Sequence, residues 1–502
     1  MAKWNKDKKV LDHEHTSFWK FALKDVEEPN LQKDVFPYEE VCKIDFDHKI
    51  IPIDPAEDIF ITDTTFRDGQ QARPPYTVQQ IVDLFTLMSR LGGPNGVIRQ
   101  SEFFLYSSKD REAVEKCQDL GLRYPEITGW IRASADDVPL VKKAGLKETG
   151  ILTSASDYHI FLKLNRTRRQ AMDDYLGIVK SILGAGIIHR CHFEDITRGD
   201  IYGFCIPFAI ELMKLREESG IDIKIRLCDT MGYGVTYPGA SLPRSVDKLV
   251  RAFIEDGGVP GHLLEWHGHN DFHKAMINAT TAWLYGCSAA NTTLLGLGER
   301  TGNPPLEGLI IEYIGLRGAT NGIDTTVITD IARYFEKEIG VRIPPNFPFV
   351  GADFNVTRAG VHVDGLIKCE EIYNIFDTTR ILKRPIIPMI TDKSGKSGIA
   401  FWINVHLGLT GDNAVDKRNP GVSRIHKWIT EEYEGGRMTG ISNEELEKRV
   451  RNYIPELFLS DLEKIKFMAA QAAVNVVTQV IEHPVMKTMK PELQEPVMQQ
   501  FI

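Results

Sequence analysis

The chain has 502 residues, of which 42% are apolar and 26% are charged, and its formal net charge is −9. This length exceeds one ordinary core, so we expect one large domain with smaller pieces. The net negative charge offers no attraction for nucleic acid or for an anionic membrane. No apolar run approaches the ~18–20 residues that cross a bilayer.

The cysteines and the first residues indicate the compartment. Seven cysteines are widely spaced and form no CxxC pair. The stretch MAKWNKDKKVLDHEH (1–15) is charged and is not followed by the apolar segment of a secretory signal. We therefore expect a cytoplasmic protein with reduced thiols rather than a disulfide framework.

From residue 58 onward, short runs typical of strands alternate with longer amphipathic runs. The strand-like runs are 58–66, 97–105, 126–134, 148–156, 187–195, 222–230, 262–270 and 287–296. Helical patterns between them include 78–92, 168–186, 243–258 and 271–286, and the last is expected to begin at Asp271 as its N-cap. Eight β-then-α units in about 250 residues predict a (β/α)8 barrel, with a doubly wound open sheet as the alternative.

Polar and ionisable residues follow each of the eight expected strands. Catalytic groups of such barrels lie at the carboxyl ends of the strands. The stretches in question are 64–69, 102, 132–134, 154–159, 192–195, 229–230, 267–270 and 298–303. Each one alone is more often a turn, a helix cap or a surface residue. Their common position at one end of a barrel favours an active site.

The stretch WHGHND (266–271) suggests a metal site at this end. Side chains alternate along a strand, so His267 and His269 point the same way, about 7 Å apart along the strand. Asp68, after the first strand, is the natural third ligand. Two histidines and one carboxylate with open positions suit a divalent metal that also binds substrate.

Three separated motifs carry a family resemblance. DTTFRDGQQ (63–71), WHGHND (266–271) and LGERTGN (297–303) resemble the motifs of the metal-dependent Claisen-condensing synthases. This DRE-TIM metallolyase family includes isopropylmalate synthase and homocitrate synthase. The resemblance covers roughly residues 58–390 and implies a (β/α)8 barrel that uses a divalent metal and acetyl-CoA.

The resemblance also implies roles for individual residues. Asp68, His267 and His269 match the metal ligands, and Asn303 matches an asparagine close to the metal. Arg67 matches the arginine that binds substrate and stabilises the enolate oxygen. Glu194 matches a catalytic glutamate, Thr230 a substrate-binding threonine, and Glu299 an acidic residue of the acyl-CoA site.

A second segment, GADFNVTRAGVHVDGLIKCEEIYNIFD (351–377), is similar to the small subdomain of the family. In the family, a histidine and a tyrosine of this subdomain reach into the partner's active site. Here they are His362 and Tyr373, which implies a homodimer with shared active sites. The alternative is that His362 is an ordinary loop histidine.

The resemblance also narrows the substrate. Arg132, followed by Ser134, resembles the arginine with which homocitrate synthases bind the distal carboxylate of a 2-oxo diacid, and a guanidinium suits that group. Longer stretches such as CDTMGYGVTYPGASLPRSV (228–246) are most similar to the family member that uses oxaloacetate. The expected reaction is condensation of acetyl-CoA with oxaloacetate, followed by hydrolysis to citrate and CoA. The alternatives are a homocitrate synthase acting on 2-oxoglutarate and a metal-dependent aldolase or lyase of the same barrel superfamily.

The expected mechanism and organisation follow. His362 is the expected base, with Glu194 as the competing candidate, and Tyr373 positions or protonates. Mn²⁺ is the expected metal, although Co²⁺, Mg²⁺ and Zn²⁺ also fit. The expected parts are an N-terminal extension (1–57), the catalytic barrel (58–320), a small α+β subdomain (321–390) and a mainly helical C-terminal domain (391–502).

Overall fold

The computed structural model describes most of the chain. It covers residues 21–357 and 368–459, the antiparallel strands β1 (Ala2–Asn5) and β2 (Val10–His13), and residues 362, 365 and 366. The chain forms two compact units, Met1–Phe354 and Asn355–Ile502. The expected domain boundaries stay predictions.

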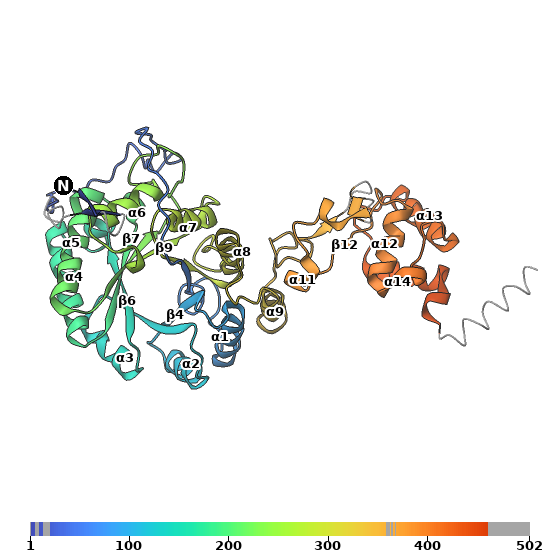
Figure 1. The fold of residues 1–502 in the computed structure, drawn as a ribbon, viewed down its shortest axis with the longest axis horizontal. Coiled ribbons are helices and arrows are strands. Elements are labelled where there is room, and N and C mark those ends of the chain that lie inside the picture. The colour runs from blue at the N-terminus through green and yellow to red at the C-terminus, as the bar shows by residue number, and fades with distance from the viewer. Residues whose placement is uncertain are drawn as a thin grey trace, which may run out of the picture. The chain divides into compact units, whose positions relative to one another are not determined.

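The first unit is built on a closed barrel of eight parallel strands (Figure 1). The strands are β3 (Phe60–Asp63), β4 (Ile98–Phe104), β5 (Glu126–Ile131), β6 (Glu148–Ser154), β7 (Ile188–Glu194), β8 (Ile223–Asp229), β9 (Leu264–Gly268) and β10 (Ala289–Thr292). Each strand pairs with the next, and β10 closes the barrel by pairing Thr292 with Asp63 of β3. The predicted (β/α)8 barrel is confirmed, and all eight expected strands are present.

Helices surround these strands. They are α1 (Val78–Gly92), α2 (Ser108–Asp119), α3 (Val138–Lys143), α4 (Arg168–Gly184), α5 (Ile206–Ser219), α6 (Val246–Glu255), α7 (Ala275–Leu284) and α8 (Leu306–Arg317). Capping boxes at Thr77 and Thr167 start α1 and α4 by satisfying free backbone N–H groups. An apolar layer joins helices to strands, as where Phe193 of β7 stacks on Phe208 of α5 with ring centroids 5.1 Å apart.

The expected N-cap at Asp271 is wrong. Helix α7 begins at Ala275, and the Asn270 side chain accepts a hydrogen bond from the Ala275 amide at 3.3 Å. The Asp271 carboxylate is instead held by Arg300, whose Nε donates to it at 2.9 Å. The Asp271 carboxylate therefore pairs with a guanidinium from a distant loop instead of capping the helix.

The chain before the barrel is bound to it along residues 24–47, which we term the N-terminal strap. The Lys24 amide donates to the Gly203 carbonyl at 2.9 Å, and the Asp47 amide donates to the Gly239 carbonyl at 3.0 Å. Arg168 is fully buried and donates both to the Lys24 carbonyl and to the Asp157 carboxylate. The strap thus lies across the loops that follow β6, β7 and β8.

After the barrel, α9 (Val327–Tyr334) packs on α1, and the Tyr334 hydroxyl donates to Asp83 at 2.6 Å. The second unit pairs β11 (Val356–Thr357) in parallel with β12 (Ile387–Pro388) and contains α11 (Thr378–Leu382). Its core lies among α12 (Lys396–Leu407), α13 (Pro420–Glu434) and α14 (Asn443–Tyr453). The helical C-terminal region is therefore confirmed up to residue 459, and residues 460–502 lie outside the described residues. Within the described residues, every helix is too short or too polar to cross a membrane.

Candidate metal centre and active site

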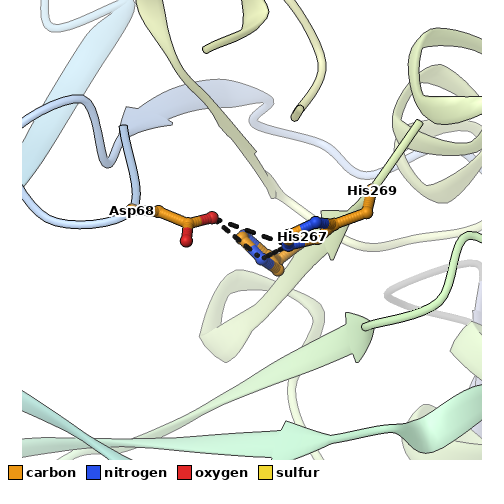
Figure 2. A group of neighbouring side chains, drawn as sticks. All are labelled: Asp68, His267 and His269. Atoms are coloured by element: carbon orange, nitrogen blue, oxygen red, sulfur yellow. Dashed lines mark hydrogen bonds and ion pairs between the residues drawn. The ribbon is translucent and has the colours of Figure 1, made fainter. Parts of the chain in front are cut away.

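The three side chains predicted as metal ligands meet at the mouth of the barrel (Figure 2). Asp68 lies in the loop after β3, and His267 and His269 lie at the end of β9. The Nε2 atoms of His267 and His269 are 3.2 Å apart. The Oδ2 atom of Asp68 lies 3.7 Å and 3.6 Å from them, respectively. One ion between these three atoms would touch all of them.

The charge states of these groups suit a metal. Burial raises the pKa of the Asp68 carboxyl, but the Arg67 guanidinium, the two neighbouring imidazoles and the Asn303 hydrogen bond together outweigh burial, and the pKa falls to about 2. Burial lowers the pKa of His267 to about 3 and also lowers the pKa of His269. At neutral pH the group is therefore one carboxylate and two neutral imidazoles, which is the protonation state that binds metal.

Asn291 orients His267, a role that the sequence analysis missed. Its Oδ1 atom lies 2.7 Å from His267 Nδ1, and its Nδ2 donates to the Thr62 hydroxyl at 2.9 Å. An amide oxygen only accepts, so Nδ1 carries the proton and the Nε2 lone pair faces Asp68. Asn291 stands in the uncharged run AANTT, so no local signal marked it.

Asn303 adds a further oxygen to the centre. Its Nδ2 donates to Asp68 Oδ2 at 3.0 Å, while its Oδ1 is buried and has no hydrogen-bond partner among the described residues. A Cβ at Gly298 would come within 1.8 Å of that oxygen, so only glycine leaves it room. Two imidazole nitrogens, a carboxylate and an amide oxygen form a donor set that fits a divalent ion.

Arg67 lies beside the metal centre and is held by Glu102. Its Nη1 is 3.5 Å from Asp68 Oδ1, and its Nε donates to Glu102 Oε1 at 3.0 Å. The side chain is largely buried, and its guanidinium carbon lies 5.8 Å from the Trp130 ring centroid. Glu102 lies on β4, and its position at an expected strand end did not indicate this contact with Arg67.

Glu194, at the end of β7, lies among three donors. It accepts from the Ser154 hydroxyl at 3.0 Å and from Lys163 Nζ at 3.0 Å, and His159 Nδ1 lies 2.8 Å away. Burial raises the pKa of Glu194, but His159 and Lys163 outweigh burial and the pKa falls to about 2. The group is a fixed carboxylate at neutral pH and accepts a proton poorly.

Thr230 and Glu299 also lie at the mouth of the barrel. The Thr230 hydroxyl accepts from the Asp195 amide at 2.9 Å. The Glu299 side chain is half exposed and lies 3.9 Å from Arg300 Nη1. A cavity of about 310 Å³ opens beside this loop, and its lining includes residues 295–298, 300–302 and 341–344.

Arg132 and Ser134 make local contacts at the end of β5. Arg132 donates from Nε and Nη2 to the Asp137 carboxylate at 2.9 and 3.0 Å, and its side chain is 69% exposed. The Ser134 hydroxyl accepts from the Asp136 amide at 3.3 Å and caps the short helix Ala135–Asp137. A carboxylate that binds Arg132 would share the guanidinium with Asp137.

In the second unit, His362 and Tyr373 lie side by side. Their ring centroids are 4.3 Å apart with an angle of 33° between the planes. Both side chains are exposed, and Gly365 packs against the Tyr373 ring, where a Cβ would come within 2.8 Å. The structure thus brings the predicted pair together.

A family model described as HMGL-like matches residues 58–334, which is more than half of the chain. The chain belongs to the HMGL-like family. The match spans the whole barrel and with it Asp68, His267 and His269. The resemblance to the condensing synthases of this family is confirmed.

Three relatives of this HMGL-like chain are informative. It is 79% identical over 502 residues to a citrate (Re)-synthase of Syntrophus aciditrophicus, covering all of this chain and 80% of that protein. It is 51% identical to a citrate (Re)-synthase of Clostridium kluyveri, covering 87% and 96%. It is 33% identical to a 2-phosphinomethylmalate synthase of Streptomyces hygroscopicus, covering 85% and 97%.

Proposed function

We propose that this protein is a citrate (Re)-synthase. It condenses acetyl-CoA with oxaloacetate and hydrolyses the resulting thioester to citrate and CoA. The observation that carries the proposal is the 79% identity, along the whole chain, to a protein of that name. The cluster of Asp68, His267 and His269 supplies the chemistry that such a reaction needs.

Asp68, His267 and His269 would hold the metal, with Asn303 Oδ1 as an adjacent oxygen. We propose Mn²⁺, because the carboxylate of Asp68 and the amide oxygen of Asn303 suit it, and Co²⁺, Mg²⁺ or Zn²⁺ are the other candidates. When bound, a divalent ion supplies Lewis-acid polarisation of the carbonyl of a 2-oxo acid.

Arg67 stabilises negative charge on the reacting oxygens. Its guanidinium stands 3.5 Å from a metal ligand, Asp68, and it is largely shielded from water, where a charge acts more strongly. The developing enolate of acetyl-CoA and the alkoxide formed at C2 of oxaloacetate are the charges that it opposes.

His362 is the proposed base that removes the methyl proton of acetyl-CoA, and Tyr373, whose ring lies beside it, positions or protonates the substrate. We propose that both come from the partner subunit of a homodimer. Glu194 is the weaker candidate for the base, because a carboxyl with a pKa of about 2 is a poor proton acceptor. Its contacts instead suit it to orient His159 and Lys163 at the mouth of the barrel.

Arg132, Ser134 and Thr230 are the proposed contacts of oxaloacetate, and Glu299 belongs to the acyl-CoA side. A guanidinium shared with Asp137 is fixed in place and can still pair with the distal carboxylate of the diacid. The proposed compartment is the cytoplasm, where the seven free cysteines stay reduced.

The proposal is tested by release of CoA thiol from acetyl-CoA. The protein is stripped of metal with EDTA and assayed with and without Mn²⁺, with oxaloacetate, 2-oxoglutarate or 2-oxoisovalerate offered separately. Metal-restored turnover with oxaloacetate alone is the expected result. Turnover with 2-oxoglutarate instead would identify a homocitrate synthase, and no thiol release with any acid would favour the lyase alternative.

A further inference from the structure

Arg226 lies inside the barrel between two buried glutamates. It stands on β8 with no exposed surface, and its Nη1 donates to Glu102 Oε1 at 3.0 Å. Its Nε and Nη2 donate to the two carboxylate oxygens of Glu265 on β9, at 2.8 and 3.2 Å. In the part of the chain that the structure describes, all side-chain hydrogen bonds of Arg226 go to these two carboxylates.

Glu102 links Arg226 to the reacting centre. The same oxygen, Oε1, that accepts from Arg226 also accepts from Arg67 Nε at 3.0 Å and from the Thr64 hydroxyl at 3.2 Å. Glu265 is in turn 3.1 Å from Nε of Arg190, deeper in the barrel. A row of alternating charges thus runs from Arg190 through Glu265, Arg226 and Glu102 to Arg67.

We propose that Arg226 is a positioning residue, which fixes Glu102 from below and through it aims the Arg67 guanidinium at the metal centre. The inference rests on the proposed function, in which Arg67 stabilises the enolate and the alkoxide. Arg226 itself is too deeply buried to meet substrate, so its effect on the reaction passes through Glu102.

The charges explain why an arginine is needed at this position. Without Arg226, two buried carboxylates would lose their shared cation, and a buried charge that loses its partner is strongly unfavourable. Glu102 would then rely on Arg67 and draw it away from Asp68. The neighbouring His192 lies 3.3 Å from Glu102 Oε2 and cannot replace the charge, because burial lowers its pKa to about 3 and keeps it neutral.

The planar fork of arginine matters as well as its charge. Arg226 reaches Glu102 with one nitrogen and Glu265 with the other two, and this bridging is beyond a single ammonium group. Arg226→Lys therefore keeps the charge inside the barrel but loosens Glu102. Comparison of Arg226→Met with Arg226→Lys therefore separates the contribution of the positive charge from that of the bridging hydrogen-bond geometry.

The experiment compares wild-type protein with Arg226→Met, Arg226→Lys and Arg190→Met, as full-length chains saturated with Mn²⁺. Arg190 is the matched control, because it is equally buried and also pairs with two glutamates, Glu148 and Glu265, but stands two contacts farther from Arg67 along the row. Readouts are kcat, KM for oxaloacetate, Mn²⁺ affinity and the thermal midpoint.

Arg226→Met is expected to lower kcat about 10- to 100-fold, because small displacements of a catalytic group cost rates of that order. The KM and the Mn²⁺ affinity should stay within about threefold of wild type, because Arg67 acts in the transition state. Arg226→Lys should recover part of kcat. Arg190→Met should lose a similar amount of thermal stability while keeping most of kcat.

Three results would overturn the inference. These are wild-type kcat in Arg226→Met, equal losses of kcat in Arg226→Met and Arg190→Met, or a loss of Mn²⁺ affinity that accounts for the activity. If Arg226→Met does not fold, Arg226→Lys decides, and wild-type kcat in that variant counts against the proposal. If wild-type protein uses 2-oxoglutarate instead, the proposed function fails, and the same comparison is made with that acid.

Discussion

The Nδ1 atom of His267 lies 2.7 Å from the amide oxygen of Asn291, and this bond fixes which ring nitrogen faces the metal centre. The Asn291 oxygen is held in place because its own amide group donates to Thr62. The oriented pair places one lone pair of His267 beside Asp68 and His269 before any ion arrives. Preorganisation of this kind reduces the cost of binding.

Removal of the Asn291 amide is expected to weaken metal binding. Asn291→Ala should lower Mn²⁺ affinity about 10- to 100-fold, the usual effect of losing a partner behind a metal-binding histidine. Asn291→Asp keeps the acceptor and should retain most of the affinity. Calorimetric titration of metal-free protein measures both, and equal affinity of Asn291→Ala and wild type would contradict the assigned role.

His269→Ala is expected to abolish metal-dependent turnover and to lower Mn²⁺ affinity by more than about 100-fold, because one of three ligands is lost. His262→Ala, an exposed histidine near the start of the same strand, is the matched control and should bind metal normally. The measurement is Mn²⁺ binding followed by electron paramagnetic resonance. Full occupancy in His269→Ala would remove this residue from the metal centre.

Glu194 is expected not to titrate in the working pH range. Its pKa is lowered from 4.5 to about 2, so the carboxylate form persists as pH falls until well below pH 4. Glu194→Gln should therefore lower kcat by a similar factor at every pH between about 5 and 9. The pH values at which kcat rises and falls should stay the same as in wild type. An acidic limb that is present in wild type and lost in Glu194→Gln would show that Glu194 does titrate there.

Glu307, in the first turn of α8, is expected to make stability fall as pH rises. Its Oε2 accepts from the Leu295 amide at 3.1 Å, and burial raises its pKa from 4.5 to about 7. Its contribution to stability is thus complete below about pH 4.5 and is lost as pH rises through 7. Glu307→Gln keeps the acceptor and should gain up to about 3 kcal/mol over wild type between pH 5 and pH 8.

Urea unfolding at the two pH values measures the effect of Glu307→Gln. Glu312→Gln, on an exposed position of the same helix, controls for the loss of one charge. A stability difference between Glu307→Gln and wild type that is the same at pH 5 and pH 8 would be evidence against a buried acid that titrates near neutrality.

Arg168 is expected to hold the N-terminal strap. Arg168→Met leaves Asp157 buried without its cation, which should cost about 3–5 kcal/mol and expose Lys24 and Lys33 to trypsin. Arg166→Met removes an exposed pair with Asp174 and should cost less than about 1 kcal/mol. Limited proteolysis measures how fast trypsin cleaves within the strap. Equal cleavage of both variants would mean that Arg168 does not hold the strap on the barrel.

Much of the fold and the trio of ligands could be predicted because their signals are local. Period-two and period-3.6 patterns mark the strands and helices, and α1 spans the same residues, 78–92, as its pattern. His267 and His269 are two residues apart on one strand, so their common direction follows from the pleat. Asp68 could be predicted as the third ligand because the carboxyl ends of all the parallel strands lie at the same end of the barrel.

The remainder depends on which residues meet across the barrel. Arg226, Glu102 and Glu265 come from three different strands, and only the register of those strands places them together. The low pKa of Glu194 likewise comes from His159 and Lys163, in the short helix Tyr158–Lys163 that follows β6. Single-sequence patterns contain no information on such pairings, which explains why Asn291 and the buried charges were missed.

The N-terminal strap has a consequence for the order of synthesis. The strap leaves the ribosome before the barrel does, yet its partners Gly203 and Gly239 are made some 200 residues later. Domains usually fold as they emerge, from the N-terminus onward. The end of the strap must instead wait until the loop after β8 has been translated, so a nascent chain halted before Gly239 would leave residues 43–47 open to proteases and chaperones.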